Sequence, residues 1–216
     1  MGDGTLMNIL EAYIWDLDGT LIDSYGSIVS SLVDVSGFCR TPDPYDEILK
    51  AVKRGTVSGY LRGLAEKSGA DYQELYTRYR EISHGRMNEI TVIPGAKETL
   101  EKLGKAGARH FLYTHRGASA GGLLDRLALT SFFQEIVTFE NGFAPKPSGA
   151  GVRYLTEKYG LNRDQTAYIG DRSLDMQCAK DAGVRAVLYL PEDSCVTPTG
   201  LEDDIIRGLE ELTGSL

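Results

Sequence analysis

Four aspartates stand directly after short apolar runs and are the strongest candidates for chemistry. Asp16 and Asp18 follow one run, and Asp171 and Asp175 follow another. Several carboxylates close together cannot all stay ionised without compensation, and a divalent cation would supply it. Oxygen ligands without neighbouring His or Cys favour a hard ion such as Mg²⁺, which commonly uses one or two carboxylates, waters and a substrate phosphate.

A hydroxyl and an ammonium group complete this set of candidates. Thr114 follows a third apolar run, and Lys146 lies with Pro147 in the loop after a fourth. Both could donate to phosphate oxygens, so the residues predict a site for phosphoryl transfer. If strand geometry persists, Asp16 and Asp18 point to the same side, so that one can attack while the other moves protons.

The elements that must position these residues alternate between strands and helices. A strand that is one continuous apolar run is typical of a parallel sheet covered on both faces, which predicts a doubly wound α/β fold. In such a sheet, ligands bind beyond the carboxyl ends of the strands. The predicted strands are Ala12–Trp15, His110–Tyr113, Glu135–Phe139, Thr166–Ile169 and Arg185–Leu190. Residues at helical spacing predict helices around Val152, Leu155 and Tyr159 and around Ile205, Ile206, Leu209 and Leu212.

About 90 residues separate the first two strands, and most have helical periodicity. We predict an inserted helical domain at residues 22–90 in an α/β core of residues 7–21 and 91–216. The alternative is that these helices thicken a single domain. Turn residues interrupt the segment at Gly37, Pro42, Pro44 and Gly69, and Pro94 suits the first turn of a helix running through Leu100 and Leu103.

Composition excludes several classes of function. The chain has 216 residues and a net charge of −8, which disfavours a nucleic acid partner. No apolar run is long enough to span a bilayer, so we expect a cytoplasmic protein, as a monomer or homodimer. Cys39, Cys178 and Cys195 form no C-x-x-C pair and are expected to be reduced. The first six residues are a candidate appendage, because Met7 offers a second start.

Four motifs in order resemble the haloacid dehalogenase superfamily over about residues 11–190. They are the D-x-D-G-T-[LV] signature at Asp16 to Leu21, the hydroxyl residue Thr114, Lys146, and the acidic motif from Gly170 to Asp175. Each could instead be structural, as a turn, a helix cap or a solvated cation. The resemblance implies a Rossmann-like core with a helical C1-type cap, and a small phosphorylated metabolite as substrate.

The resemblance also implies roles for these residues. Asp16 would attack phosphorus to form an aspartyl-phosphate, and Asp18 would protonate the leaving oxygen and then activate water. Mg²⁺ would be bound by Asp16, by the backbone carbonyl of Asp18 and by Asp171. Asp175 would bind the metal through water or hold Lys146.

Lys146 would neutralise charge on Asp16 and on the phosphoryl group, and Thr114 would donate to a phosphoryl oxygen. Backbone amides around Leu17 and His115 would complete the phosphate site.

Substrate selection is expected from other positions. His115 and Arg116 stand where the family often has Asn or Gly, and they could bind substrate or make structural contacts. Lys53 and Arg54 precede a glycine-containing turn and could bind an anionic group, or simply be solvated cations at a helix C-terminus. Arg62 is a weaker candidate.

Relatives of this layout include phosphoglycolate phosphatases and β-phosphoglucomutases. The mutases often have Glu before the acidic-motif Asp, whereas this chain has Gly170, which favours hydrolysis. A phosphonoacetaldehyde hydrolase would need a cap lysine, for which Lys53 is only loosely placed, and the residues after Asp16 disfavour a dehalogenase. A non-catalytic phosphate-binding module is disfavoured because Asp16 and Asp18 are both present.

Overall fold

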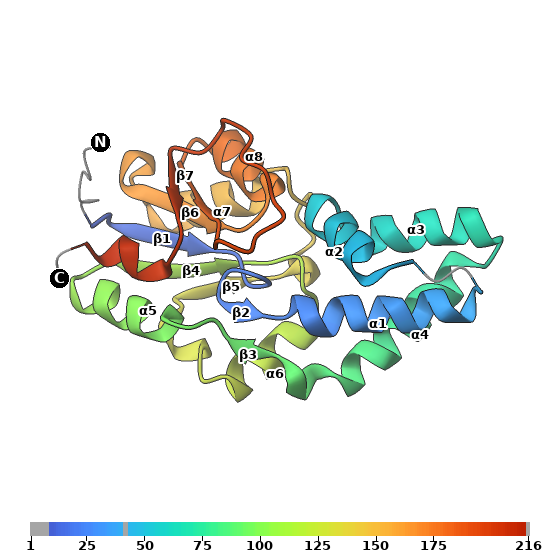
Figure 1. Cartoon of the computed structure of the whole chain (residues 1–216). Helices are drawn as coiled ribbons and strands as arrows, with labels where there is room; N and C mark the ends of the chain where they lie inside the picture. The colour runs from blue at the N-terminus through green and yellow to red at the C-terminus, as the bar shows by residue number, and fades with distance from the viewer. Residues whose placement is uncertain (1–8, 41–42, 215–216) are drawn as a thin grey trace. The chain divides into compact units, whose positions relative to one another are not determined.

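A computed structural model describes residues 9–40 and 43–214 (Figure 1). The predicted appendage, the alternative start at Met7 and the turn residue Pro42 lie outside these residues. The chain divides into two compact units. Unit 1 comprises Met1–Leu21 and Val92–Leu216, and unit 2 comprises Ile22–Thr91.

Unit 1 is built on a six-stranded parallel sheet with the strand order β5-β4-β1-β6-β7-β8. The first strand lies in the middle, where Trp15 pairs with Leu112 on one side and with Ile169 on the other. The strands are β1 (Ala12–Trp15), β4 (Arg109–Tyr113), β5 (Glu135–Val137), β6 (Thr166–Gly170), β7 (Arg185–Tyr189) and β8 (Asp204–Ile206). This is the predicted doubly wound α/β arrangement, with each strand run close to its predicted bounds.

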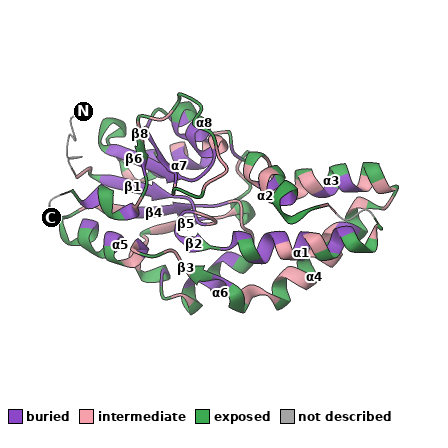
Figure 2. Cartoon of the chain, in the orientation of Figure 1, coloured by how far each residue is buried: buried purple, intermediate pink, exposed green. Residues whose placement is uncertain are grey.

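Helices cover both faces of this sheet, as expected for strands that are apolar on both sides (Figure 2). On one face, Ile14 belongs to a buried cluster with Val152 of α7 and Met176 of α8. On the other, Trp15 Nε1 donates to His110 Nδ1, and His110 Nε2 lies 3.0 Å from the carbonyl oxygen of Leu100 in α5. The helices are α5 (Ala96–Lys105), α6 (Ser119–Arg126), α7 (Ala150–Tyr159) and α8 (Ser173–Ala182), with short 3₁₀ turns η2 (Thr130–Phe132), η3 (Phe139–Asn141), η4 (Arg163–Gln165) and η5 (Leu209–Thr213).

The helix predicted near the C-terminus is wrong. Residues 204–206 form the edge strand β8, and the segment from Leu209 forms the 3₁₀ turn η5. The strand is held by Arg185, whose guanidinium donates to both carboxylate oxygens of Asp204 at 2.5 and 3.0 Å. Ile206 is buried and Ile205 is exposed, which is the alternation of a strand. The spacing of the apolar residues is compatible with a helix and with a strand, and the contacts with β7 favour the strand.

Unit 2 is a helical insertion with its own apolar core. Its helices are α1 (Tyr25–Phe38), α2 (Tyr45–Arg54), α3 (Val57–Ser68) and α4 (Tyr72–Gly85), followed by the 3₁₀ turn η1 (Met87–Glu89). Side chains at the predicted spacing, including Leu32, Val35 and Leu75, are buried together. The ends of the helices have local signals: Asp71 accepts from the Glu74 amide, and Gly69 takes a φ of +73°. Where the chain leaves and re-enters unit 1, β2 (Ile22–Asp23) and β3 (Thr91–Val92) pair as a two-stranded sheet.

Over residues 9–40 and 43–214, no helix has the length and apolarity needed to cross a membrane. The cytoplasmic location therefore stays a prediction. Cys39, Cys178 and Cys195 are free cysteines. Their reduced state stays a prediction.

Candidate active site

The candidate residues of unit 1 gather at the carboxyl edge of the sheet because the backbone ladder continues one residue past each strand. The Asp16 amide donates to the Ile169 carbonyl at 2.8 Å, and the Thr114 amide donates to the Val137 carbonyl at 2.9 Å. Asp171 directly follows β6. Parallel strands place these three ends side by side, as the sequence predicted.

The extended geometry assumed for Asp16 and Asp18 does not continue between them. The strand ends at Trp15, and the amides of Thr20 and Leu21 both donate to the Leu17 carbonyl, which closes a turn. Gly19 has a φ of +84°, in the region that favours glycine. The two aspartates consequently lie in different surroundings: Asp16 is buried, whereas the Asp18 side chain is 21% exposed.

Asp16, Lys146 and Asp175 form what we call the floor of the site. The ammonium of Lys146 donates to Asp16 Oδ1 at 2.6 Å and to Asp175 Oδ1 at 2.8 Å. All three side chains are essentially inaccessible to water. Of the two alternatives for Asp175, the structure shows contact with Lys146, so this carboxylate fixes the lysine.

Burial and the shared lysine shift the pKa values of the floor in different directions. For Asp16, burial outweighs the attraction of Lys146 and raises the pKa to about 6. For Asp175, burial acts in the same sense, but Lys146 and Arg172 outweigh it and the pKa is lowered. Burial also opposes the charged form of Lys146, yet the two carboxylates raise its pKa, so the lysine stays protonated.

Two tyrosines that the sequence analysis did not single out surround the lysine. The Lys146 nitrogen lies 5.3 Å from the centre of the Tyr113 ring and 5.2 Å from that of Tyr168. The Tyr168 hydroxyl also donates to the Tyr113 carbonyl at 3.2 Å and lies 3.4 Å from Asp175 Oδ1. Their signal in the sequence is their place in β4 and β6, two of the strands that end at the site, with Tyr113 as the last residue of β4. They exclude water from the lysine while their ring faces favour its charge.

Carboxylates able to hold a metal ion lie beside the floor. Asp16, Asp171 and Asp175 each offer an oxygen within 4.8 Å of the others. Arg172, to which the sequence analysis gave little weight, places its guanidinium 3.8 to 4.0 Å from all three carboxylates. The Asp18 side chain is not in this cluster, and its predicted contribution through the backbone carbonyl stays a prediction.

Asp18 and Arg116 form a second charged pair, which we call the rim. Arg116 Nε lies 3.2 Å from Asp18 Oδ2, and Nη2 lies 2.5 Å from Oδ1, so both carboxylate oxygens accept from one guanidinium. The arginine side chain is 14% exposed. Such a two-point contact fixes the plane of the carboxylate as well as its distance.

Thr114 and His115 contact the loops on either side of them. Thr114 Oγ1 accepts from the Arg116 amide at 3.1 Å, and His115 Nε2 accepts from the Lys146 amide at 2.7 Å. Burial, followed by the charges of Lys146 and Arg172, lowers the pKa of His115 to about 3. The ring is therefore neutral and able to accept. The predicted substrate-binding roles of His115 and Arg116 stay predictions, whereas the structural contacts offered as the alternative are present.

The cationic candidates in unit 2 occupy the end of a helix. Lys53 and Arg54 form the last turn of α2, where positive charge is favourable. The Lys53 nitrogen lies 4.5 Å from the centre of the Tyr25 ring, and Arg62 of α3 stacks on Tyr72 at 4.4 Å. Their role toward a substrate stays a prediction.

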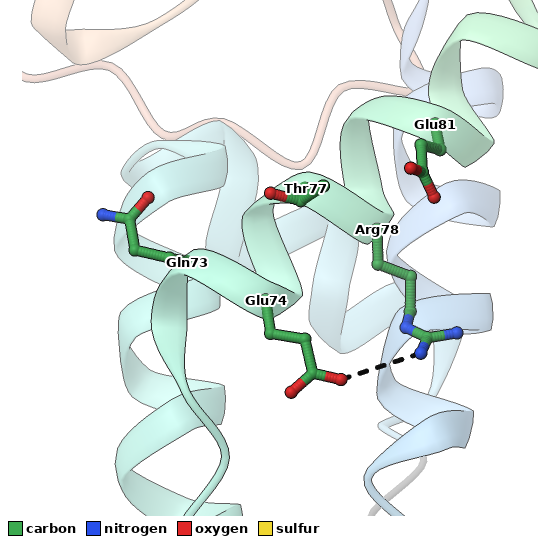
Figure 3. Close-up of a pocket in the computed structure, with 5 residues that line it drawn as sticks. All are labelled: Gln73, Glu74, Thr77, Arg78 and Glu81. Carbon is green, nitrogen blue, oxygen red and sulfur yellow. Dashed lines mark ion pairs between the residues drawn. The ribbon is translucent and has the colours of Figure 1, made fainter.

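A further hollow lies on the exposed surface of α4 in unit 2. Figure 3 shows its lining residues along one helix, with Glu74 and Arg78 joined by an ion pair of 3.7 Å. The remaining lining residues are Gln73, Thr77 and Glu81. One of the two glutamates is paired with the arginine on an open helix face, and none of the five residues is a nucleophile held by a second group.

Comparison with known proteins identifies the family. The family model for haloacid dehalogenase-like hydrolases matches residues 13–189, which include every motif described above. The chain belongs to this family. It is 30% identical to phosphoglycolate phosphatase of Agrobacterium fabrum, over 89% of this chain and 86% of the relative, and 29% identical to phosphoglycolate phosphatase of Pseudomonas putida, over 85% and 70%. The resemblance inferred from the motifs is confirmed.

The fold of this haloacid dehalogenase-like hydrolase agrees with that of solved members. A family hydrolase from Deinococcus radiodurans, determined with bound phosphate and sodium, superposes with a TM-score of 0.76 over 94% of this chain and 93% of that one, at 20% identity. The family model and the relatives together support a hydrolase of the phosphatase type.

Proposed function

We propose that the protein is a Mg²⁺-dependent phosphatase that hydrolyses a small phosphomonoester through an aspartyl-phosphate. The observation that carries this proposal is the hydrogen bonding of the two carboxylate oxygens of Asp16. Lys146 holds one of its oxygens at 2.6 Å, while no hydrogen-bond donor among residues 9–40 and 43–214 reaches the buried Oδ2. The Arg172 guanidinium lies 3.9 Å from this oxygen, beyond hydrogen-bond distance. A carboxylate with one oxygen held by a lysine and the other accepting no hydrogen bond is suited to attack a phosphorus atom brought against it.

In the first half-reaction, an Asp16 oxygen forms a bond to phosphorus as the bond from phosphorus to the leaving oxygen breaks. Asp18 gives its proton to that leaving oxygen. In the second half-reaction, Asp18 takes a proton from water, the water oxygen attacks phosphorus, and the bond to Asp16 breaks. Lys146 neutralises charge on Asp16 throughout, and the Thr114 hydroxyl donates to a phosphoryl oxygen.

The residues present fit a divalent cation. Asp171 lies beside Asp16 in a buried, all-oxygen set of donors, which suits a hard ion such as Mg²⁺. Asp16 and Asp171 are the best ligands, because Asp175 already accepts from Lys146 and from the Arg172 amide. When bound, the ion would offset the negative charge of the carboxylates and of the phosphoryl group.

We propose only the chemical class of the substrate, which is a small phosphomonoester. The relatives named above carry the name phosphoglycolate phosphatase, which makes small anionic phosphomonoesters the first compounds to test. We further propose that unit 2 is the cap that selects the substrate, with Lys53 and Arg54 as candidates to bind its anionic group.

A mutase is less well supported, for a steric reason at Gly170. A Cβ atom at this position would lie 2.3 Å from Asp175 Cβ, and the Asp175 side chain is held by Lys146 and Tyr168. The Glu that often stands here in related mutases therefore has no room. This favours transfer of the phosphoryl group to water.

The test is Mg²⁺-dependent release of inorganic phosphate from a panel of small phosphomonoesters that includes phosphoglycolate and sugar phosphates. Asp16→Asn and removal of metal with EDTA are each expected to abolish release. Asp164→Asn is the matched control, because Asp164 is exposed on η4 and the chemical change is the same. Phosphate release that survives Asp16→Asn would contradict the proposed mechanism. Folded, metal-loaded protein without release from any ester would favour a mutase or a binding module.

A further inference from the structure

The loop after β4 fixes Arg116 before any ligand binds. The Arg116 amide donates to Thr114 Oγ1 at 3.1 Å, and its carbonyl accepts from the Phe139 amide at 3.3 Å. One residue later, a Cβ at Gly117 would lie 2.8 Å from Glu140 Oε1, which also accepts from the Ala118 amide at 3.2 Å. Both backbone polar groups of Arg116 are thus engaged, and the next two residues pack against η3.

From this fixed backbone, the guanidinium reaches a carboxylate 98 residues earlier in the sequence. Its Nε and Nη2 contact the two oxygens of Asp18, so the contact sets both the position and the plane of that carboxylate. Each carboxylate oxygen has two acceptor sites, so accepting from Arg116 does not by itself prevent either oxygen from exchanging a proton with a substrate or with water.

We propose that Arg116 is a positioning residue for Asp18, and that it speeds the transfer of the proton between Asp18 and the leaving oxygen without binding the substrate itself. This inference rests on the proposed phosphatase function. The chain turns at Gly19 and the Asp18 side chain is 21% exposed, so the two-point contact with Arg116 fixes a carboxylate that water can reach. A lysine at position 116 would keep the charge but lose the planar two-point contact.

The proton transfer gives a distinctive dependence on the substrate. Protonation matters most when the leaving group is a poor one, such as an alkoxide, and little when it is a nitrophenolate. The value of kcat/KM reports the first half-reaction, in which the leaving group departs. Arg116→Lys is therefore expected to lower kcat/KM for alkyl phosphates by about 10- to 100-fold, which is less than the loss expected when the general acid itself is removed, and to change it little for 4-nitrophenyl phosphate.

A double-mutant cycle tests whether Arg116 acts through Asp18. In an Asp18→Asn protein, adding Arg116→Lys should cause no further loss with either substrate. Arg153→Lys is the matched control, because Arg153 of α7 also donates to a carboxylate, that of Asp181 in α8, at 2.8 Å. This replacement should leave kcat/KM unchanged for both esters. An equal loss for both classes of ester, persisting in Asp18→Asn, would overturn the proposal and indicate direct substrate binding. Unchanged kcat/KM for alkyl phosphates would overturn it as well.

A measurement without turnover separates this inference from the proposed function. In the ligand-free protein, the ¹³C carboxyl signal of Asp18 is expected to shift in Arg116→Lys and to stay in place in Arg153→Lys. An unmoved signal would overturn the inference whatever the enzyme does with esters. If the wild type releases no phosphate but the Asp18 signal moves in Arg116→Lys, the proposed function is contradicted. The contact of Arg116 with Asp18 is then still supported.

Discussion

The floor and the rim of the site each contain one aspartate of the same short motif, in opposite conditions. At the floor, Asp16 shares one buried lysine with Asp175, and water reaches none of the three groups. At the rim, Asp18 has a guanidinium of its own and is 21% exposed. Although only two residues apart, Asp16 lies where an ionised carboxylate is costly, and Asp18 lies where water can partly solvate its charge. The floor should govern stability and the attack on phosphorus, and the rim should govern proton transfer.

Removing the cation from each region gives the largest expected contrast. Lys146→Met leaves two buried carboxylates without their ammonium, and we expect the free energy of unfolding to fall by about 3–5 kcal/mol. Arg116→Met acts on a partly exposed pair, where water can reach the remaining carboxylate, and should cost less, about 1–2 kcal/mol. Urea denaturation of metal-free protein measures both. Equal losses in the two variants would remove the distinction between floor and rim.

Removing the rim carboxylate should affect catalysis far more than stability. Asp18→Asn keeps the shape of the side chain but neither gives nor takes the proton, so kcat should fall on the order of 10²–10⁴-fold. Its midpoint of urea denaturation should stay close to that of the wild type. Phosphate release and denaturation measured on the same preparation check this. A large loss of stability would show that the rim also supports the fold.

Neutralising the floor carboxylate should stabilise the metal-free protein, and the effect depends on pH. The pKa of Asp16 is raised from 3.8 to about 6, so the folded state binds a proton that the unfolded state has lost. Its contribution to stability is therefore most favourable below about pH 4 and is lost as the pH rises to about 6. Asp16→Asn should raise the free energy of unfolding above pH 6 by about 1–3 kcal/mol, since each pKa unit corresponds to about 1.4 kcal/mol.

That gain should vanish at about pH 4, because Lys146 keeps its pairing with Asp175 in both proteins. Urea denaturation in EDTA at several pH values measures the difference. A variant less stable than the wild type at pH 7 would show that the lysine needs both carboxylates.

The smallest effect concerns the two histidines of unit 1, His110 and His115. Burial lowers the pKa of His110 to about 4 and that of His115, next to the floor, to about 3. Both rings should therefore stay neutral as the pH falls from 8 to 5, with His115 accepting from the Lys146 amide throughout. NMR of the imidazole nitrogens over this range should show constant signals for both. Titration of His115 near its ordinary value would mean that the loop carrying Lys146 opens.

The sequence by itself determined five of the six strands of the sheet and the residues at its carboxyl edge. Buried parallel strands are continuous apolar runs, and the run ending at Trp15 is therefore visible without any knowledge of its neighbours. The ends of such strands meet at one edge, which predicts that Asp16, Thr114 and Asp171 lie together. The order of four motifs indicated the family, and the family in turn implied the candidate chemistry.

Only the tertiary structure decided which of these residues touch one another. The edge strand β8 depends on the pairing of Asp204 with Arg185, and the same apolar spacing is equally typical of a helix. The contact of Arg116 with Asp18 joins residues 98 positions apart, and no local pattern encodes it. Long charged side chains can reach several partners, and the choice among them is made by the packing of loops that are distant in sequence. For this reason, the sequence revealed the carboxylates, and the fold divided them into a buried floor and a partly exposed rim.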